Sequence, residues 1–174
     1  MDPDFFLIWN MKRGDHAAMD TFVRRYYPVI LRYCQYRLNC REDAEDLTQD
    51  TFVRFFAALP TYAHRGKALN YLYTIAGNLC RDYYRSTTNV SRNASGTTAS
   101  EQRIAGHPAD PGQMSADALP TDQIDSRIDL TRALQRLPEE LREIIILCYF
   151  QDLKQTDAAN ILGIGLPLVK YRIR

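Results

Sequence analysis

The sequence predicts an all-α protein in which a flexible linker joins two small helical domains. Apolar residues recur at helical spacing over residues 1–86 and again over 123–174, and signals for strands are weak in both parts. Between them, residues 87–122 are rich in Ser, Thr, Asn, Ala, Gly, Pro and Asp and contain few large apolar side chains. Such a segment buries too little surface to offset the entropy of ordering it, so we expect it to be a linker.

The bulk composition excludes several classes of protein. The chain has 174 residues, 45% of them hydrophobic, and a net charge of +1, so any nucleic-acid binding must come from local patches. We find no apolar run long enough to span a bilayer and no basic signal region at the start, and we expect no direct membrane insertion. The four cysteines and three histidines are scattered, which favours reduced thiols without a metal or another cofactor.

Helix start and stop signals divide the first domain into four helices. Gly14 ends a short helix, and Asp15 caps the long helix that follows. Pro28 should kink or restart that long helix, and Pro60 ends the third. A loop over 61–67 then leads into the fourth helix. The expected bounds are 4–13, 15–38, 42–59 and 68–85.

The third helix carries a strongly acidic face opposite its apolar stripe. This face contains Glu42, Asp46, Gln49, Asp50 and Val53. Acids in the first turns suit the helix dipole, so the face is explained by simple solvation. A docking surface for a basic partner is an alternative interpretation. A metal-dependent hydrolase is a third interpretation, although no histidine or second carboxylate cluster completes such a site.

The fourth helix carries a polar, mostly basic stripe. Spacings of three and four residues place six side chains on one face: Lys67, Tyr71, Thr74, Asn78, Arg81 and Arg85. His64 and Arg65 in the preceding loop add to them. Positive charge, amide, hydroxyl and aromatic groups suit phosphate contact, base-edge hydrogen bonding and base stacking. An ordinary solvated surface is the alternative.

The second domain ends in a predicted helix-turn-helix over 155–173. It follows a helix over 128–137, another that starts at Pro138, and a turn at 151–153. Gly163 supplies the positive φ of the sharp turn, and Pro167 can begin the second helix. The polar residues near the start of that helix, where side chains reach major-groove bases, are Lys170, Tyr171, Arg172 and Arg174. A plain helical hairpin remains the alternative.

Three segments together resemble a known family. Residues 43–52 read D-A-E-D-L-T-Q-D-T-F and resemble the polymerase-docking segment of bacterial sigma factors. Residues 71–78 read Y-L-Y-T-I-A-G-N and are similar to the W-L-x-x-I-A-x-N helix of those proteins. Residues 134–138 and 158–170 resemble their second domain. The order and spacing of these segments resemble the small extracytoplasmic-function (ECF) type of the sigma-70 family, over nearly all of the chain except the linker.

The resemblance implies a non-catalytic, cytoplasmic bacterial sigma factor that directs RNA polymerase to promoters and aids their melting. The first domain would be sigma region 2 and the second sigma region 4. Asp46, Gln49 and Asp50 would contact the clamp helices of the largest polymerase subunit, and the polymerase flap is a further expected contact. An anti-sigma protein is another expected partner, and no small-molecule substrate is expected. The alternative is a sigma-like helix-turn-helix regulator that does not engage core polymerase.

The resemblance also implies how promoter DNA is held. The loop over 62–68 and Asn78 would hold flipped bases of the minus-ten element, while Lys67, Arg81 and Arg85 grip phosphates. The four polar residues of the last helix would contact the minus-thirty-five element. The chain departs from the family pattern in having Tyr71 for Trp, and Leu168 for a hydroxyl residue. It also ends within the recognition helix, so we expect a truncated second domain or weak binding of the upstream element.

Overall fold

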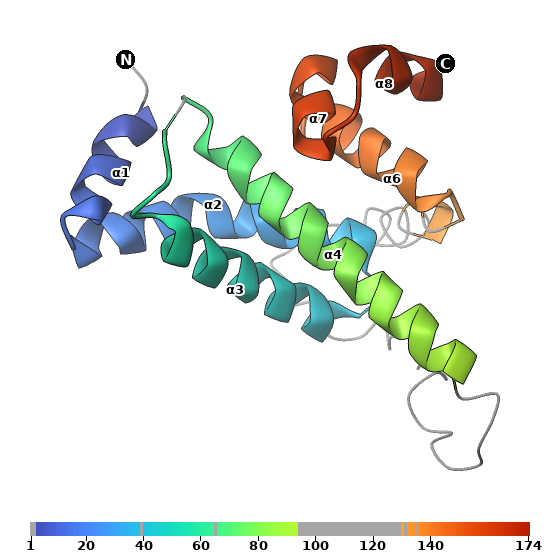
Figure 1. The fold of residues 1–174 in the computed structure, drawn as a ribbon, viewed down its shortest axis with the longest axis horizontal. Helices are drawn as coiled ribbons and strands as arrows, with labels where there is room; N and C mark the ends of the chain where they lie inside the picture. Colours follow the sequence, from blue (N-terminus) through green and yellow to red (C-terminus); the bar gives the residue numbers. More distant parts are fainter. Residues whose placement is uncertain (1–2, 39, 65, 94–129, 131, 135) are drawn as a thin grey trace, which may run out of the picture.

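The computed structural model describes residues 3–38, 40–64, 66–93, 130, 132–134 and 136–174, and these residues form an all-α protein. No strand occurs among them. A π-helical segment, Ile146–Phe150, continues one of the helices. The helices are α1 (Pro3–Lys12), α2 (His16–Arg37), α3 (Arg41–Ala58), α4 (Ala68–Asn93), α6 (Glu139–Ile145), α7 (Gln155–Leu162) and α8 (Leu166–Ile173) (Figure 1). None of these described helices combines the length and apolar character that crossing a membrane requires.

The first domain packs α2, α3 and α4 around an aromatic core, with α1 against α2. Phe22 of α2 stacks on Phe55 of α3 with ring centroids 4.8 Å apart, and both rings are buried. The hydroxyls of Thr48 and Thr51 are also buried and donate hydrogen bonds to carbonyls one turn earlier in α3. These two buried hydroxyls are thus satisfied within their own helix.

The predicted boundaries of α2 are largely confirmed. The Asp15 carboxylate accepts hydrogen bonds from the backbone N–H groups of Ala17 (2.9 Å) and Ala18 (3.3 Å), as a helix cap does. Gly14 adopts φ +85°, the left-handed conformation that ends α1. Pro28 lies inside α2, which continues to Arg37 as one helix, so the alternative of a restart is wrong. Buried residues on both sides of Pro28 hold the helix against its neighbours.

Helix α4 continues to Asn93, beyond the predicted end at 85 and into the segment assigned to the linker. Ser86 and Thr87 both donate their hydroxyl hydrogen to the Tyr83 carbonyl oxygen at 2.7 Å. These bonds satisfy the hydroxyls along the helix, so polar residues do not end it here. The rest of the predicted linker, 94–122, lies outside the described residues.

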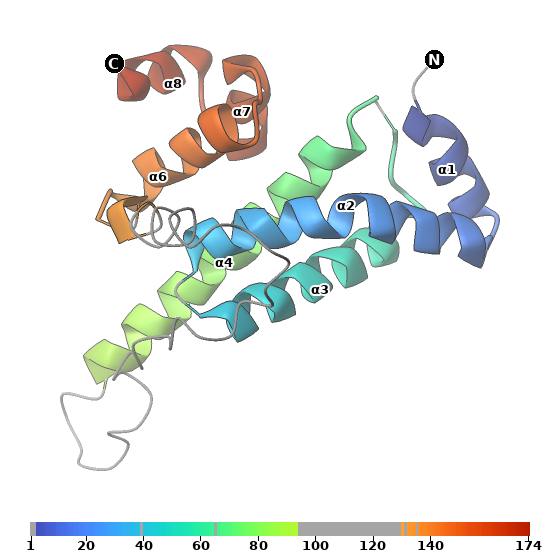
Figure 2. The ribbon, with the colours of Figure 1, turned by 180° about the vertical axis from the view of Figure 1, so that it is seen from behind.

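The second domain contains the predicted helix-turn-helix (Figure 2). Gly163 adopts φ +65° between α7 and α8, as the sharp turn requires. Ile144, Ala159 and Val169 form the small core beneath this turn. Residues 130 and 132–134 are helical within the predicted helix 128–137, and residues 128, 129, 131 and 135 of that helix lie outside the described part.

The two domains pack against each other, with α7 beside α4 in both views (Figures 1 and 2). The Tyr36 and Phe150 rings, one from each domain, lie 4.9 Å apart between centroids. The Tyr73 hydroxyl of α4 donates a 2.7 Å hydrogen bond to Oε1 of Gln151. Five buried residues of the second domain join the main apolar core: Leu134, Ile146, Leu147, Ala158 and Ile161. The two domains therefore share one core.

Candidate polymerase and nucleic-acid interfaces

The acidic face of α3 is exposed, as the sequence predicts. Asp46, Gln49, Asp50 and Val53 all lie on the surface, and the Val53 side chain is 64% exposed. Their positions are fixed by the opposite face, which is buried in the first-domain core. No group of three or more His, Cys, Asp or Glu side chains within the described residues is placed to hold a metal ion. The face therefore offers charge and hydrogen-bond acceptors to a partner.

Two other acids of α3 make contacts within the domain. The Tyr83 hydroxyl of α4 donates a 2.5 Å hydrogen bond to Asp43, and Arg41 forms a 2.8 Å ion pair with Glu45. The bond to Asp43, together with partial burial and the carboxylate charge, raises the pKa of Tyr83 well above its usual value. Tyr83 therefore stays protonated as a donor that ties α3 to α4.

Aromatic side chains gather where the loop before α4 meets the helix. Tyr62 stacks on Tyr71 with centroids 4.9 Å apart and planes 23° from parallel, and the Phe55 ring lies 5.6 Å from Tyr62. The Tyr62 hydroxyl lies 3.4 Å from Nδ1 of His64. The structure thus brings His64 and Tyr71 to one place, as expected. Arg65 lies outside the described residues.

Helix α1 borders this aromatic cluster, a contact that the sequence patterns did not predict. Lys12 donates a 2.7 Å hydrogen bond to the Tyr62 carbonyl oxygen, and the Phe5 ring lies 6.4 Å from His64. Phe5, Phe6 and Trp9 are 57%, 63% and 48% exposed. A signal was present in the sequence, because these aromatic residues fall outside the helix face that Ile8 and Met11 bury.

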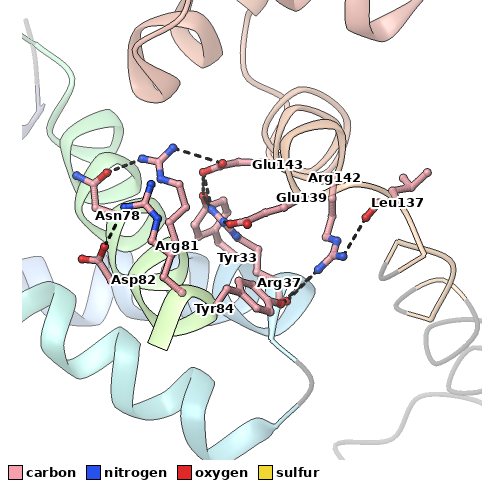
Figure 3. A network of polar contacts seen from close by, with 11 residues as sticks. Tyr33, Arg37, Asn78, Arg81, Asp82, Tyr84, Leu137, Glu139, Arg142 and Glu143 are labelled. Atoms are coloured by element: carbon pink, nitrogen blue, oxygen red, sulfur yellow. Dashed lines mark hydrogen bonds and ion pairs between the residues drawn. The ribbon is translucent and has the colours of Figure 1, made fainter. Parts of the chain in front are cut away.

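The remaining residues of the α4 stripe differ in their surroundings, and Figure 3 shows two of them, Asn78 and Arg81. Asn78 is exposed and accepts a 2.5 Å hydrogen bond from Arg81, while Thr74 donates to the Asn70 carbonyl oxygen at 3.0 Å. Arg85 is exposed and lies 3.8 Å from Asp82. The other two cations contact the second domain: Lys67 pairs with Asp157, and Arg81 lies 3.6 Å from Glu143.

Beneath Arg81 lies a buried polar network between the domains (Figure 3). Glu143 accepts a 2.5 Å hydrogen bond from Arg37 and a 3.0 Å bond from the Tyr33 hydroxyl, and all three residues are buried. Arg37 also forms a 2.8 Å ion pair with Glu139. Burial raises the pKa of Tyr33 well above its usual value, so its hydroxyl remains a donor.

The predicted DNA-contacting residues of the helix-turn-helix are mostly exposed on α8. Lys170, Tyr171 and Arg174 lie on the surface, and Tyr171 is 78% exposed. These three line one shallow depression together with Gln155 and Pro167. Arg172, the fourth predicted residue, is only partly exposed and forms an ion pair with Glu140.

Both domains match known protein families. Sigma-70 region 2 matches residues 22–90, and Sigma-70, region 4 matches residues 127–174. The chain is 31% identical over 160 residues to the ECF RNA polymerase sigma factor SigD of Mycobacterium bovis, a match that covers 86% of this chain and 69% of SigD. This chain belongs to the ECF sigma factors of the sigma-70 family. Membership of this family assigns it to transcription initiation.

Two further proteins resemble this ECF sigma factor. The ECF RNA polymerase sigma factor SigE of Mycolicibacterium smegmatis is 34% identical over 168 residues, and the match covers 92% of this chain but only 60% of SigE. The sigma factor RpoE of Bartonella quintana, solved in complex with the anti-sigma factor NepR, is 23% identical with a TM-score of 0.67. That match covers 88% of each chain and supports the fold.

The family matches include the predicted site residues of this ECF sigma factor but not the exposed surface of α1. The acidic face of α3 and the α4 stripe lie inside the region 2 match, and the α8 residues lie inside the region 4 match. The exposed aromatic residues of α1 precede both matches. The family resemblance therefore accounts for the position of the predicted residues but not for the α1 surface.

Proposed function

We propose that this ECF sigma factor binds core RNA polymerase in the bacterial cytoplasm, directs it to promoters and aids duplex opening without catalysing a reaction. The observation that carries the proposal is the arrangement of region 2. Its acidic α3 face and its aromatic and basic α4 stripe are separate surfaces of one domain. One surface can therefore hold the polymerase while the other holds DNA.

The acidic face is the proposed polymerase contact. Asp46, Gln49 and Asp50 would meet the clamp helices of the largest subunit, and region 4 would meet the flap. The exposed carboxylates of α3 favour a basic partner and would speed its association. Buried residues on the opposite side of α3 fix the helix in the domain, so its backbone needs little reordering on binding.

The α4 stripe and its adjacent loop are the proposed minus-ten surface. The stacked rings of Tyr62 and Tyr71 resemble the platforms on which proteins stack unpaired bases. His64, Arg65, Thr74 and Asn78 would add polar contacts to extruded bases. Phosphates would be held by Lys67, Arg81 and Arg85. Trapping bases outside the stack would favour the open duplex without bond chemistry.

The remaining partners follow from region 4 and from the structural relatives. We assign contact with the minus-thirty-five element to Lys170, Tyr171, Arg172 and Arg174. The similarity to RpoE, which was solved with the anti-sigma factor NepR, supports an anti-sigma protein as a regulator of this chain.

The decisive experiment is co-elution with bacterial core RNA polymerase on a sizing column. We expect the wild type to co-elute and the Asp46→Asn/Asp50→Asn double variant to be lost from the complex, because both charges of the docking face are removed. Asp20→Asn is the control, since Asp20 lies on α2 in an exposed pair with Arg24. Circular dichroism would show that all three chains keep their helix content.

A contrary result would also be informative. A wild-type chain that stays apart from core polymerase but binds duplex DNA would contradict the proposal. It would instead support a helix-turn-helix regulator that does not engage the enzyme.

A further inference from the structure

Glu143 belongs to region 4, yet its carboxylate is surrounded by donors from region 2 (Figure 3). Tyr33 and Arg37 of α2 both hydrogen-bond its Oε1, and Arg81 of α4 lies 3.6 Å from its Oε2. The Glu143 and Arg37 side chains are only 4% and 1% exposed. The two regions thus share one buried ion pair.

A buried ion pair between the domains favours two discrete arrangements of the molecule, one with the domains closed and one with them fully separated. A charge without a partner is costly to bury, so Glu143 and Arg37 must remain paired while the domains are closed. When the domains separate, water replaces each partner. A half-open state would leave both groups poorly solvated and unpaired, and is therefore disfavoured.

Gly77 makes this close approach possible. A Cβ atom at Gly77 would lie 2.8 Å from Oε1 of Glu143 and 3.1 Å from the Tyr33 hydroxyl. The first distance is shorter than real Cβ contacts allow, so a side chain at this position would force the Glu143 carboxylate away from its present place. The α4 surface is therefore shaped to receive Glu143.

A second region 4 carboxylate takes another cation of the stripe. Asp157 of α7 forms an ion pair with Lys67, at the start of α4. Lys67 and Arg81 are two of the three cations assigned to promoter phosphates, whereas Arg85 lies beside Asp82 of its own helix. Carboxylates of region 4 thus stand where DNA phosphates would bind.

We propose that Glu143 and Asp157 act as an internal competitor for DNA, so that domain closure and binding at the α4 stripe exclude each other. This inference rests on the proposed function, because it assigns a regulator to the same DNA-binding surface. If only a fraction of the free protein is open, its apparent dissociation constant for DNA equals the intrinsic constant divided by that fraction. Opening the domains therefore strengthens DNA binding without adding a contact.

Two variants of the 174-residue chain test the competition by different routes. Glu143→Gln keeps the shape of the side chain but removes its charge, whereas Gly77→Ala inserts a methyl group against the carboxylate and leaves every charge in place. Asp152→Asn is the matched control. It removes the same charge from an exposed turn of region 4, where φ is +50° and Asn is well tolerated.

The readout is fluorescence anisotropy with a labelled pool of random single-stranded 20-mer DNA at low salt. We expect Glu143→Gln and Gly77→Ala to tighten binding by about fivefold or more, and Asp152→Asn by less than about twofold. Small-angle scattering should show a larger radius of gyration for both opening variants than for the wild type. Circular dichroism confirms that their helices remain folded.

Three results would overturn the inference. One is an extended wild-type chain in scattering, and another is an unchanged affinity in both variants. The third is a gain for Glu143→Gln that Asp152→Asn matches, since this would reflect net charge alone. If Glu143→Gln disturbs the fold of region 4, the DNA affinity of Gly77→Ala alone tests the competition.

The co-elution experiment separates this inference from the proposed function. If the wild type binds core polymerase and the opening variants bind DNA no better, internal competition fails and the sigma factor role stands. If the chain never binds the polymerase but both variants open and bind DNA more tightly, the proposed sigma factor role fails and internal competition stands.

Discussion

The four cysteine side chains differ sharply in their surroundings. Cys34 and Cys80 are buried in the region 2 core, whereas Cys40 and Cys148 are partly exposed. A hydrogen bond with Cys34, together with burial, raises the pKa of Cys80 well above its usual value. A 2.7 Å hydrogen bond to Glu42 raises the pKa of Cys40. A raised pKa leaves less thiolate, which is the reactive form, at any given pH.

We predict two classes of thiol in the native protein. At about pH 8, a disulfide reagent should modify Cys40 and Cys148 first and reach Cys34 and Cys80 only after unfolding. Raising the pH should speed the reaction of Cys40 beyond the pH at which an unperturbed thiol levels off, because its pKa is raised. Mass spectrometry of peptides after timed labelling measures this order. Early modification of Cys80 would contradict its burial in the region 2 core.

At the scale of the element, α4 serves three purposes, and the surfaces for region 4 and for DNA overlap at Lys67 and Arg81. Leu72, Ala76 and Cys80 face the region 2 core, Tyr73 meets Gln151 of region 4, and the stripe from Lys67 to Arg85 carries the proposed DNA contacts. A substitution in the stripe therefore acts on DNA alone only where the residue does not also contact region 4.

Arg85 meets that condition, so we predict a simple electrostatic effect of Arg85→Gln. Binding to promoter DNA should weaken across sequences, and the slope of log affinity against log salt should fall by about one. Arg54→Gln, an exposed cation of α3, is the control and should leave the slope unchanged. The measurement is anisotropy of the polymerase holoenzyme on labelled promoter DNA across a salt series. If the slope for Arg85→Gln equals that of the wild type, Arg85 does not contact a DNA phosphate.

At the scale of the whole molecule, the shared core couples the two domains. Leu147 of region 4 is fully buried in the same apolar cluster as Phe22, Phe55 and Leu72 of region 2. The single tryptophan, Trp9, lies on α1 and so reports on region 2. A destabilising substitution in the core of one domain should therefore also lower the unfolding midpoint measured in the other domain.

We predict that Leu147→Ala lowers the urea midpoint reported by Trp9 fluorescence. The cavity should cost about 2–5 kcal/mol of the free energy of unfolding, and closed domains unfold as one cooperative unit. Far-UV circular dichroism should give the same midpoint as fluorescence. Leu168→Ala is the control, since Leu168 is among the exposed apolar residues of α8. If Leu147→Ala left the urea midpoint of Trp9 fluorescence unchanged, the two domains would unfold independently.

The sequence by itself determined the helices, their faces and the family. Helical periodicity is a local property, so it placed the exposed acids of α3 and the polar stripe of α4 correctly. Caps and turns are equally local, as Asp15 and Gly163 show. The end of α4 was missed because the hydroxyl bonds of Ser86 and Thr87 to their own helix outweigh the turn preference of their composition.

Only the tertiary structure decided how the two domains meet. Three features depend on residues far apart in the chain: the pairing of Arg37 with Glu143, the pairing of Lys67 with Asp157, and the close approach of Glu143 to Gly77. Periodicity shows which face of a helix is polar but carries no information about which partner that face meets. That choice depends on the packing of the whole core, so surfaces that look open in the sequence are covered in the folded molecule.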